Sequence, residues 1–423
     1  MRRFIFLTVS MLFAIVLPAQ DTSQQVVAGR LNAIAQRSKP YVILISADGF
    51  RYDFATKYNA VNLQRLAKQG VQAEYMQPSF PSLTFPNHYS IVTGLYPAHH
   101  GLVDNSFYDR QRQVLYSMSD RKMVQDAYWY GGEPLWVLAE KQQLLSASYY
   151  WVGSEAREEG IAPSYFYYYS DKVLIEQRLA VVKQWLQLPE EKRPHLICFY
   201  FPQVDHAAHL FGPESPETAE AVRWVDEAIG NMTRLTDSLG LPVNYVFVSD
   251  HGMVKVNNEQ AMGLPAALDT NRYIVSRGDA ILQLYAKDGH GIRKQFRKLR
   301  RTQDGYTTYL KKQLPAHWHY GVKDDRYQRI GDIVLIPTYP KIFGAFSKKI
   351  TPGKHGYDPL MPEMRASFLA WGPGVANAGL VPAFENIHVY PFVAGLLGLS
   401  YDPATIDGKG TVLSKYLRLN SQP

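Results

Sequence analysis

The sequence has one cysteine among its 423 residues, Cys198, so the chain cannot form an internal disulfide bond. Extracellular animal domains commonly depend on disulfide bonds. If this chain is exported, their absence favours a bacterial periplasmic or secreted protein. Cys198 itself lies in the apolar run at 195–201, and we expect it to be a small core residue.

Long apolar runs are absent apart from one at the N-terminus. The stretch at 4–17 follows two arginines and precedes Pro18-Ala19-Gln20, a pattern typical of a secretory signal peptide spanning residues 1–19. It is shorter than the roughly 20 residues that cross a bilayer, although an uncleaved anchor remains the alternative. No cysteine follows the stretch, which excludes a bacterial lipoprotein anchor. We therefore expect a periplasmic or secreted protein without stable membrane insertion.

Low-complexity tracts, repeats of fixed period and arginine-rich arms are also absent. This argues against a solenoid or propeller and against specific nucleic-acid binding. The formal net charge is +7, and a basic surface would attract anionic small-molecule substrates, although we expect most of these charges to be ordinary solvated side chains. The sequence does not define the oligomeric state, and we take the chain as a monomer.

Short apolar runs alternate with amphipathic segments along most of the chain. We expect strands at 41–46, 144–151, 196–201, 244–249 and 366–371, and helices at 62–69, 134–141, 172–188, 217–239 and 389–399. This alternation predicts an α/β fold, with a central, mostly parallel sheet and helices on both faces. Residues 262–352 interrupt it, and we expect a small inserted subdomain within a single catalytic domain at 39–423. The polar segment at 20–38 is expected to be a loose lead-in.

Candidate metal ligands follow the predicted strands, where α/β sheets collect their ligands. They are Asp48, Asp205, His209, Asp250, His251 and, in a glycine-rich loop, His355. Alone, each could cap a turn or form a local hydrogen bond. Together, three carboxylates and three imidazoles form a good ligand set for zinc. The pattern therefore predicts a metal centre at the carboxyl ends of the strands.

Thr84 supplies a candidate nucleophile in the segment Phe80–Tyr89. A threonine hydroxyl is a weak nucleophile that needs activation, which coordination to zinc provides. A second zinc about 4 Å away can hold the leaving oxygen of an in-line displacement. Residues 87–93 are expected to begin a helix whose free N–H groups favour a phosphate. The alternative for Thr84 is a hydroxyl that caps this helix.

Six motifs in order carry a resemblance to a known family. They are Ala47–Arg51, Thr84–Tyr89, Thr93–Pro97, Asp205 with His209–Pro213, Ser249–Met253 and His355–Asp358. The chain resembles the nucleotide pyrophosphatase/phosphodiesterase family of the alkaline phosphatase superfamily from about residue 41 to about residue 399. The resemblance implies an alkaline-phosphatase-like fold and a zinc-dependent hydrolase.

The resemblance also implies roles for individual residues. One zinc would be held by Asp205, His209 and His355, and the other by Asp48, Asp250, His251 and the Thr84 hydroxyl. The Asn105 side chain and the backbone N–H of Phe85 would donate to a non-bridging phosphoryl oxygen. Phe85 and Tyr169 would enclose a nucleobase, with Tyr200 nearby. Tyr165, Tyr167 and Tyr168 crowd Tyr169, so simple packing remains the alternative for this tyrosine.

The implied reaction is hydrolysis of a nucleotide phosphodiester or pyrophosphate bond through a phospho-threonine, which releases a nucleoside monophosphate. Thr84 argues against a sulfatase, because sulfatases use a modified cysteine at this position. Monoesterase relatives carry a Lys-x-Arg pair where this chain has Ala156-Arg157-Glu158, which favours diesters. The alternatives are a phospholipid or choline-phosphate diesterase, a phosphonate hydrolase and a non-catalytic nucleotide-binding relative.

Overall fold

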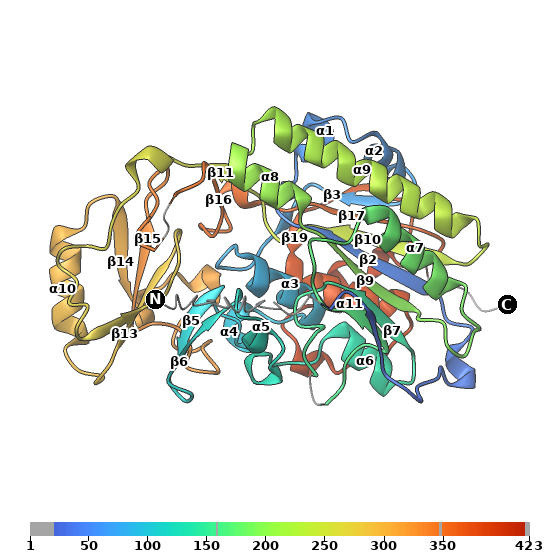
Figure 1. The fold of residues 1–423 in the computed structure, drawn as a ribbon, viewed down its shortest axis with the longest axis horizontal. Coiled ribbons are helices and arrows are strands. Elements are labelled where there is room, and N and C mark those ends of the chain that lie inside the picture. Colours follow the sequence, from blue (N-terminus) through green and yellow to red (C-terminus); the bar gives the residue numbers. More distant parts are fainter. Residues whose placement is uncertain (1–20, 158–159, 347–348, 419–423) are drawn as a thin grey trace, which may run out of the picture.

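The computed structural model describes residues 21–157, 160–346 and 349–418 (Figure 1). The predicted signal peptide at 1–19 lies outside these ranges. Among the described residues, no helix combines the length and the apolarity needed to cross a bilayer.

A nine-stranded sheet forms the centre of the molecule. From edge to edge its strands are β1 (Gln24–Val26), β8 (Tyr165–Tyr167), β7 (Ser146–Tyr149), β9 (Leu196–Phe201), β2 (Tyr41–Ala47), β10 (Val243–Val248), β17 (Phe368–Trp371), β3 (Val71–Ala73) and β18 (Gly379–Val381). The run from β8 to β10 is parallel throughout, whereas β1 and β17 pair antiparallel with their neighbours. The predicted α/β class with a mostly parallel sheet is confirmed.

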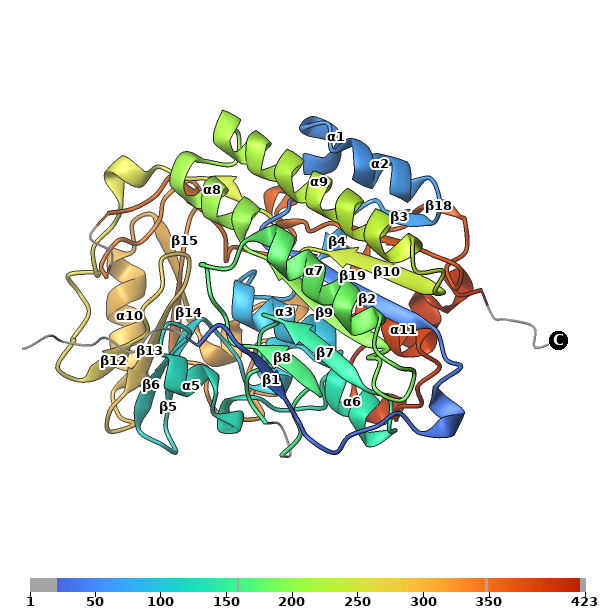
Figure 2. The ribbon, with the colours of Figure 1, turned by 45° about the vertical axis from the view of Figure 1, so that its right-hand side comes forward.

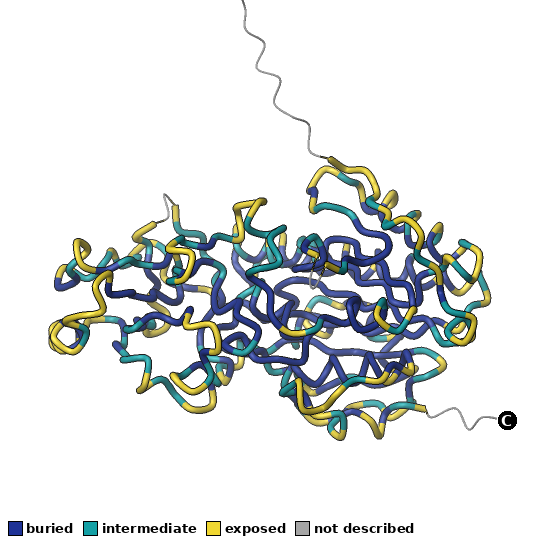
Figure 3. Tube along the Cα trace, turned by 90° about the horizontal axis from the view of Figure 1, so that it is seen from below, coloured by how far each residue is buried: buried dark blue, intermediate teal, exposed yellow. Residues whose placement is uncertain are grey.

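Helices cover both faces of this sheet (Figure 2). One face carries α1 (Phe54–Lys57), α2 (Val61–Ala67), α7 (Ile175–Leu186) and α9 (Pro216–Asp237), and the other carries α3 (Thr84–Thr93), α6 (Leu135–Lys141) and α11 (Val389–Leu396). Strand β2 shows why both faces are covered. Ile43 and Ile45 belong to the first core, whereas Val42 and Leu44 belong to the second, because successive side chains of a strand point to opposite faces. Figure 3 shows the buried chain concentrated at this centre.

Residues 262–352 contain a second sheet at one end of the molecule (Figure 1). Its strands, in order, are β12 (Tyr273–Val275), β13 (Leu282–Ala286), β15 (Ile333–Pro337) and β14 (Tyr306–Leu310). Helix α10 (Ile292–Thr302) packs Phe296 and Leu299 into a separate small core. A buried contact ties the segment to the main sheet domain, because Gln283 Nε2 donates to Asp104 Oδ2 at 2.9 Å.

The segment before β2 differs from the loose lead-in that the sequence predicts. Strand β1 adds an edge strand by pairing with β8. Asn32 is buried, donates to the carbonyls of Glu190 and Arg193, and accepts from the Leu145 N–H. These partners are backbone groups, and their positions depend on the folded sheet. The polar composition of residues 20–38 therefore does not indicate that β1 and Asn32 form these contacts.

Candidate active site

The six candidate ligands meet at the carboxyl ends of β2, β9 and β10. Asp48 directly follows β2, and Asp250 and His251 follow β10. Asp205 and His209 lie on α8 (Gln203–Phe211), which follows β9, and His355 follows the short strand β16 (Gly353–Lys354). Parallel strands end at the same edge of a sheet, so ligands that are far apart in the sequence become neighbours.

Two groups of ligand atoms form at this edge. In the first group, His251 Nε2 lies 2.9 Å from Asp250 Oδ2 and 3.5 Å from Asp48 Oδ1. In the second group, His209 Nε2 lies 3.0 Å from His355 Nε2 and 3.3 Å from Asp205 Oδ1. The rings of His251 and His355 stack with centroids 3.6 Å apart. The two groups are therefore in direct contact through these rings and form one continuous cluster of candidate metal ligands.

The chemistry of these groups fits divalent cations. A buried oxygen of Asp48 and one of Asp205, the Oδ1 atom in each, form no hydrogen bond within the described chain, and such burial is costly without a compensating charge. Burial, with repulsion from Asp250 and Asp205, raises the pKa of Asp48 well above its usual value. Burial also lowers the pKa of His355, which keeps its imidazole neutral, the form that binds metal.

Thr84 is the first residue of α3 and faces this centre. Its Oγ1 lies 3.3 Å from His251 Nε2. The residue that caps α3 is Leu83, and no side chain forms a capping hydrogen bond there. The hydroxyl therefore does not serve as the helix cap. The helix begins three residues earlier than the sequence suggests, which places the threonine at the positive end of the helix dipole.

Asn105 is held next to Thr84 by a hydrogen bond to the backbone. The N–H of Phe85 donates to Asn105 Oδ1 at 3.1 Å. The two groups predicted to bind a phosphoryl oxygen are therefore adjacent. Because Oδ1 accepts this bond, the amide orientation is fixed, and the Asn105 Nδ2 group is the donor available to an oxyanion.

A cavity of about 400 Å³ opens beside Thr84. Its lining includes Asp48, Thr84, Phe85, Met118, Arg121, Tyr150, Trp151, Glu155, Tyr169, Tyr200 and Asp205. Phe85 and Tyr169, the predicted nucleobase contacts, both line it. The Tyr200 hydroxyl donates to Asp48 Oδ2 at 2.6 Å. Tyr200 therefore orients a candidate metal ligand as well as forming part of the cavity wall.

His88 is a site residue to which the sequence reasoning gave no role. On α3, its Nδ1 lies 3.0 Å from the Thr84 carbonyl oxygen and 3.3 Å from Asp250 Oδ2, and its Nε2 lies 2.7 Å from Ser46 Oγ. Groups of this kind orient metal-binding carboxylates. The sequence feature that could have indicated this role is the spacing, because His88 lies one helical turn after Thr84 and so on the same helix face.

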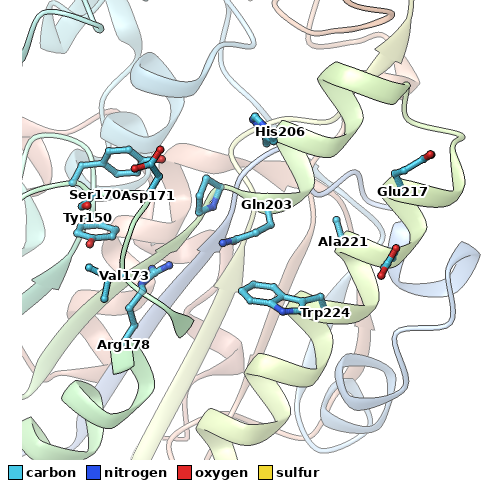
Figure 4. A pocket seen from close by; sticks show the side chains of 13 residues that line it. Tyr150, Ser170, Asp171, Val173, Arg178, Gln203, His206, Glu217, Ala221 and Trp224 are labelled. Carbon is cyan, nitrogen blue, oxygen red and sulfur yellow. The ribbon is translucent and has the colours of Figure 1, made fainter. Parts of the chain in front are cut away.

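A second cavity, of about 550 Å³, is larger than the one beside Thr84 and is a separate feature (Figure 4). Tyr150 borders it on one side, and side chains of α8 and α9, among them His206 and Trp224, border it on the other. Tyr169 also lines this cavity. None of the six candidate ligands lines it. A third cavity, of about 320 Å³, touches His209 and His355.

The strand-end metal centre and the sheet order define an alkaline-phosphatase-like fold, and the comparisons with known proteins give the family. The family described as Type I phosphodiesterase / nucleotide pyrophosphatase matches residues 42–358. The chain therefore belongs to this family.

Several relatives match over most of the chain. Ectonucleotide pyrophosphatase/phosphodiesterase family member 1 of Rattus norvegicus is 33% identical over 378 residues, covering 86% of this chain and 41% of that protein. An uncharacterized pyrophosphatase/phosphodiesterase of Schizosaccharomyces pombe is 33% identical over 403 residues, covering 89% of this chain and 81% of that protein. This chain thus spans less than half the length of the rat relative.

Solved structures show the same fold. Murine ectonucleotide pyrophosphatase/phosphodiesterase 5 superposes with a TM-score of 0.82 at 26% identity, covering 89% of this chain and all of that one. An inactive threonine-to-alanine variant of that protein, in complex with AMP, gives a TM-score of 0.83 at 26% identity and covers 90% of this chain and all of that one.

Proposed function

We propose that this protein hydrolyses phosphodiester and pyrophosphate bonds of nucleotides, releases nucleoside monophosphates and uses two zinc ions. The observation that carries the proposal is the position of Thr84 Oγ1, 3.3 Å from His251 Nε2 at the start of α3. The printed names of the relatives support the reaction class. The AMP complex of the murine relative supports a nucleotide as substrate.

The residues present define how the centre would be loaded. Asp48, Asp250 and His251 would hold the zinc ion next to Thr84, and Asp205, His209 and His355 would hold the other. These ions supply positive charge that lowers the pKa of a bound hydroxyl or water and neutralises a departing oxygen.

Thr84 carries the covalent chemistry. Its Oγ1 forms a bond to phosphorus while the bond from phosphorus to the leaving oxygen breaks, so the nucleotide is transferred to the threonine as a diester. Water then attacks the same phosphorus, and the bond to Thr84 Oγ1 breaks. This second displacement releases the nucleoside monophosphate and regenerates the hydroxyl, so the reaction proceeds in two steps.

Asn105 and the first turn of α3 stabilise charge on the phosphoryl group. The Asn105 Nδ2 group donates to a non-bridging oxygen, and its orientation is fixed by the bond that Oδ1 accepts from Phe85. The N-terminal end of a helix also favours an anion. Donors fixed in advance are effective, because they need little rearrangement as charge develops.

Phe85 and Tyr169 form the aromatic part of the neighbouring cavity. Flat aromatic side chains stack favourably on other flat rings. We propose that a nucleobase occupies this cavity while the phosphoryl group lies at Thr84.

The decisive test replaces the nucleophile. Thr84→Ala should abolish hydrolysis of the p-nitrophenyl ester of thymidine 5′-monophosphate, because no hydroxyl remains to attack phosphorus, while the zinc content stays at that of the wild type. Colorimetric rates and metal analysis by mass spectrometry measure the two quantities. Thr93→Ala is the matched control at the other end of α3 and should keep its activity. Full activity in Thr84→Ala would exclude the proposed nucleophile.

A further inference from the structure

The positive charge of the chain is concentrated in the inserted segment, residues 262–352. This segment contains 17 lysines and arginines and seven aspartates, with no glutamate. The rest of the chain has 28 basic and 31 acidic residues, whereas the whole chain has a net charge of +7. The excess of positive charge therefore comes from this segment alone. Solubility does not require such a division, because a surface with both signs interspersed already provides it.

Helix α10 carries the densest part of this charge. Six of its 11 residues are basic and none is acidic. Within the 3.6-residue turn of a helix, the six positions fall inside an arc of about 160°. Phe296 and Leu299 point the other way, into the small core of the segment. We call the six exposed cations the basic face of α10: Arg293, Lys294, Arg297, Lys298, Arg300 and Arg301.

The basic face is not neutralised within the part of the chain that the structure describes. No salt bridge there includes any of its six cations, and the acidic residues that flank the helix pair elsewhere. Asp288 Oδ2 lies 2.7 Å from Arg272 Nη2, and Asp304 Oδ1 lies 3.2 Å from Lys341 Nζ. Three pairs of the cations stand four residues apart, and like charges at that spacing destabilise a helix. An anionic partner would offset this repulsion.

Two observations favour an anionic lipid surface over a nucleic acid as this partner. Proteins that bind single strands stack the bases on exposed aromatic rings, whereas Phe296, the only aromatic residue of α10, is 7% exposed. The apolar stretch at 4–17 also predicts export, which brings a chain to the surfaces of membranes. A layer of anionic headgroups needs no aromatic contact, because its attraction for a protein grows with the number of basic residues near it.

We propose that the basic face of α10 binds this protein to membranes that contain anionic phospholipids, such as phosphatidylglycerol. The contact is electrostatic and reversible, because Phe296 and Leu299 are packed in the small core and do not enter the lipid. Figure 1 shows α10 at the end of the molecule away from the central sheet. None of the six cations lines the three cavities described above, so the inference does not depend on the proposed function.

Co-sedimentation with lipid vesicles tests the proposal. Wild-type protein should bind phosphatidylcholine vesicles that contain about 30% phosphatidylglycerol, and it should not bind pure phosphatidylcholine. The triple substitution Arg297→Gln, Lys298→Gln and Arg301→Gln should weaken binding about a hundredfold, because each basic residue near an anionic surface contributes roughly fivefold. Raising the salt from about 0.1 M to about 1 M should release the wild-type protein, since screening then acts within about 3 Å.

A second triple variant separates the basic face from net charge. Arg65→Gln, Lys68→Gln and Arg223→Gln also removes two arginines and one lysine, all exposed at α2 and α9. This variant should bind the anionic vesicles as the wild type does. Circular dichroism and the temperature of thermal unfolding show whether both triple variants keep the fold, with no need for an activity measurement.

Three outcomes would overturn the inference. The first is equal binding of the wild-type protein to the two kinds of vesicle, which would assign the contact to apolar groups. The second is an equal effect of the two triple variants, which would leave α10 without a special role. The third is displacement of the protein from anionic vesicles by a DNA duplex of about 20 base pairs at an equal concentration of phosphate charge, which would assign the face to a nucleic acid.

Discussion

The two ligand groups of the metal centre differ in exposure. The side chains of Asp250 and His251 are fully buried, and that of Asp48 is 2% exposed. In the other group the side chains of Asp205 and His209 are 19% and 26% exposed, and only that of His355, at 6%, is buried. The buried group adjoins Thr84, and the exposed group adjoins the third cavity. On the proposed mechanism, the side that activates the nucleophile is enclosed, and the side from which the leaving group departs is open.

The supporting hydrogen bonds differ in the same way. Asp48 accepts from Tyr200, and Asp250 Oδ1 accepts from the Gly49 N–H at 3.1 Å. In the exposed group, His209 Nδ1 lies 2.7 Å from the carbonyl oxygen of Gly353, on the short strand β16. The buried group is thus fixed by the main sheet and α3, which predicts that the two groups respond differently to substitution.

The largest effect is expected from Asp250→Asn, which removes a ligand charge from the buried group without changing its shape. The loss of metal charge at the nucleophile should lower kcat/KM by about a thousandfold, equivalent to several kcal/mol. Metal analysis should show one zinc fewer, and excess zinc should not restore the rate. Asp226→Asn, a buried carboxylate that accepts hydrogen bonds from α2, is the control and should retain zinc. Full recovery of the Asp250→Asn rate in excess zinc would contradict the expected difference between the buried and the exposed ligand groups.

His209→Ala tests the exposed group and should have a smaller, reversible effect. Activity at limiting zinc should fall about a hundredfold, because a side chain that binds the zinc ion directly is lost. Excess zinc should restore a large part of it, since Asp205 and His355 remain and the group is open to solvent. Zinc titrations of the initial rate measure the recovery. His206→Ala, on the same helix but facing the large separate cavity, should behave as the wild type. If zinc gave no recovery in His209→Ala, the difference between the groups would disappear.

Tyr200→Phe should give the smallest effect, because it removes only the hydrogen bond to Asp48. We expect a decrease of about tenfold in kcat/KM and weaker zinc retention during dialysis against a chelator, as is usual when a ligand loses its orienting partner. The matched control is Tyr245→Phe, on β10 of the same sheet, which removes a buried hydroxyl that is hydrogen-bonded to Thr236 of α9. Equal rates and equal zinc loss in the two variants would show that Tyr200 only fills space.

Much of the fold follows from the pattern of apolar residues. The runs at 41–46 and 196–201 form β2 and β9, and the helical spacing at 217–239 matches α9, because burial on both faces leaves a continuous apolar run. The antiparallel direction of β17 was not predicted, since strand direction depends on connections rather than on composition. The pairing of β1 was missed for the same physical reason, because its partners lie elsewhere in the chain.

The candidate site was predictable where a motif contains the reacting atoms. Asp48, Asp250 and His251 lie at the ends of predicted strands, and Thr84 lies between two prolines, Pro81 and Pro86. His88 was overlooked as a support for Asp250, because its role is visible only once α3 packs against the sheet edge.

The sequence by itself determined the ligand types, their order along the chain and the α/β alternation, because these depend on local residue chemistry and periodicity. Only the tertiary structure decided that one ligand group is enclosed while the other is more open, and that residues of the inserted segment line the same cavity as His209 and His355. Exposure and proximity arise from the packing of segments far apart in sequence, and local composition does not encode that packing.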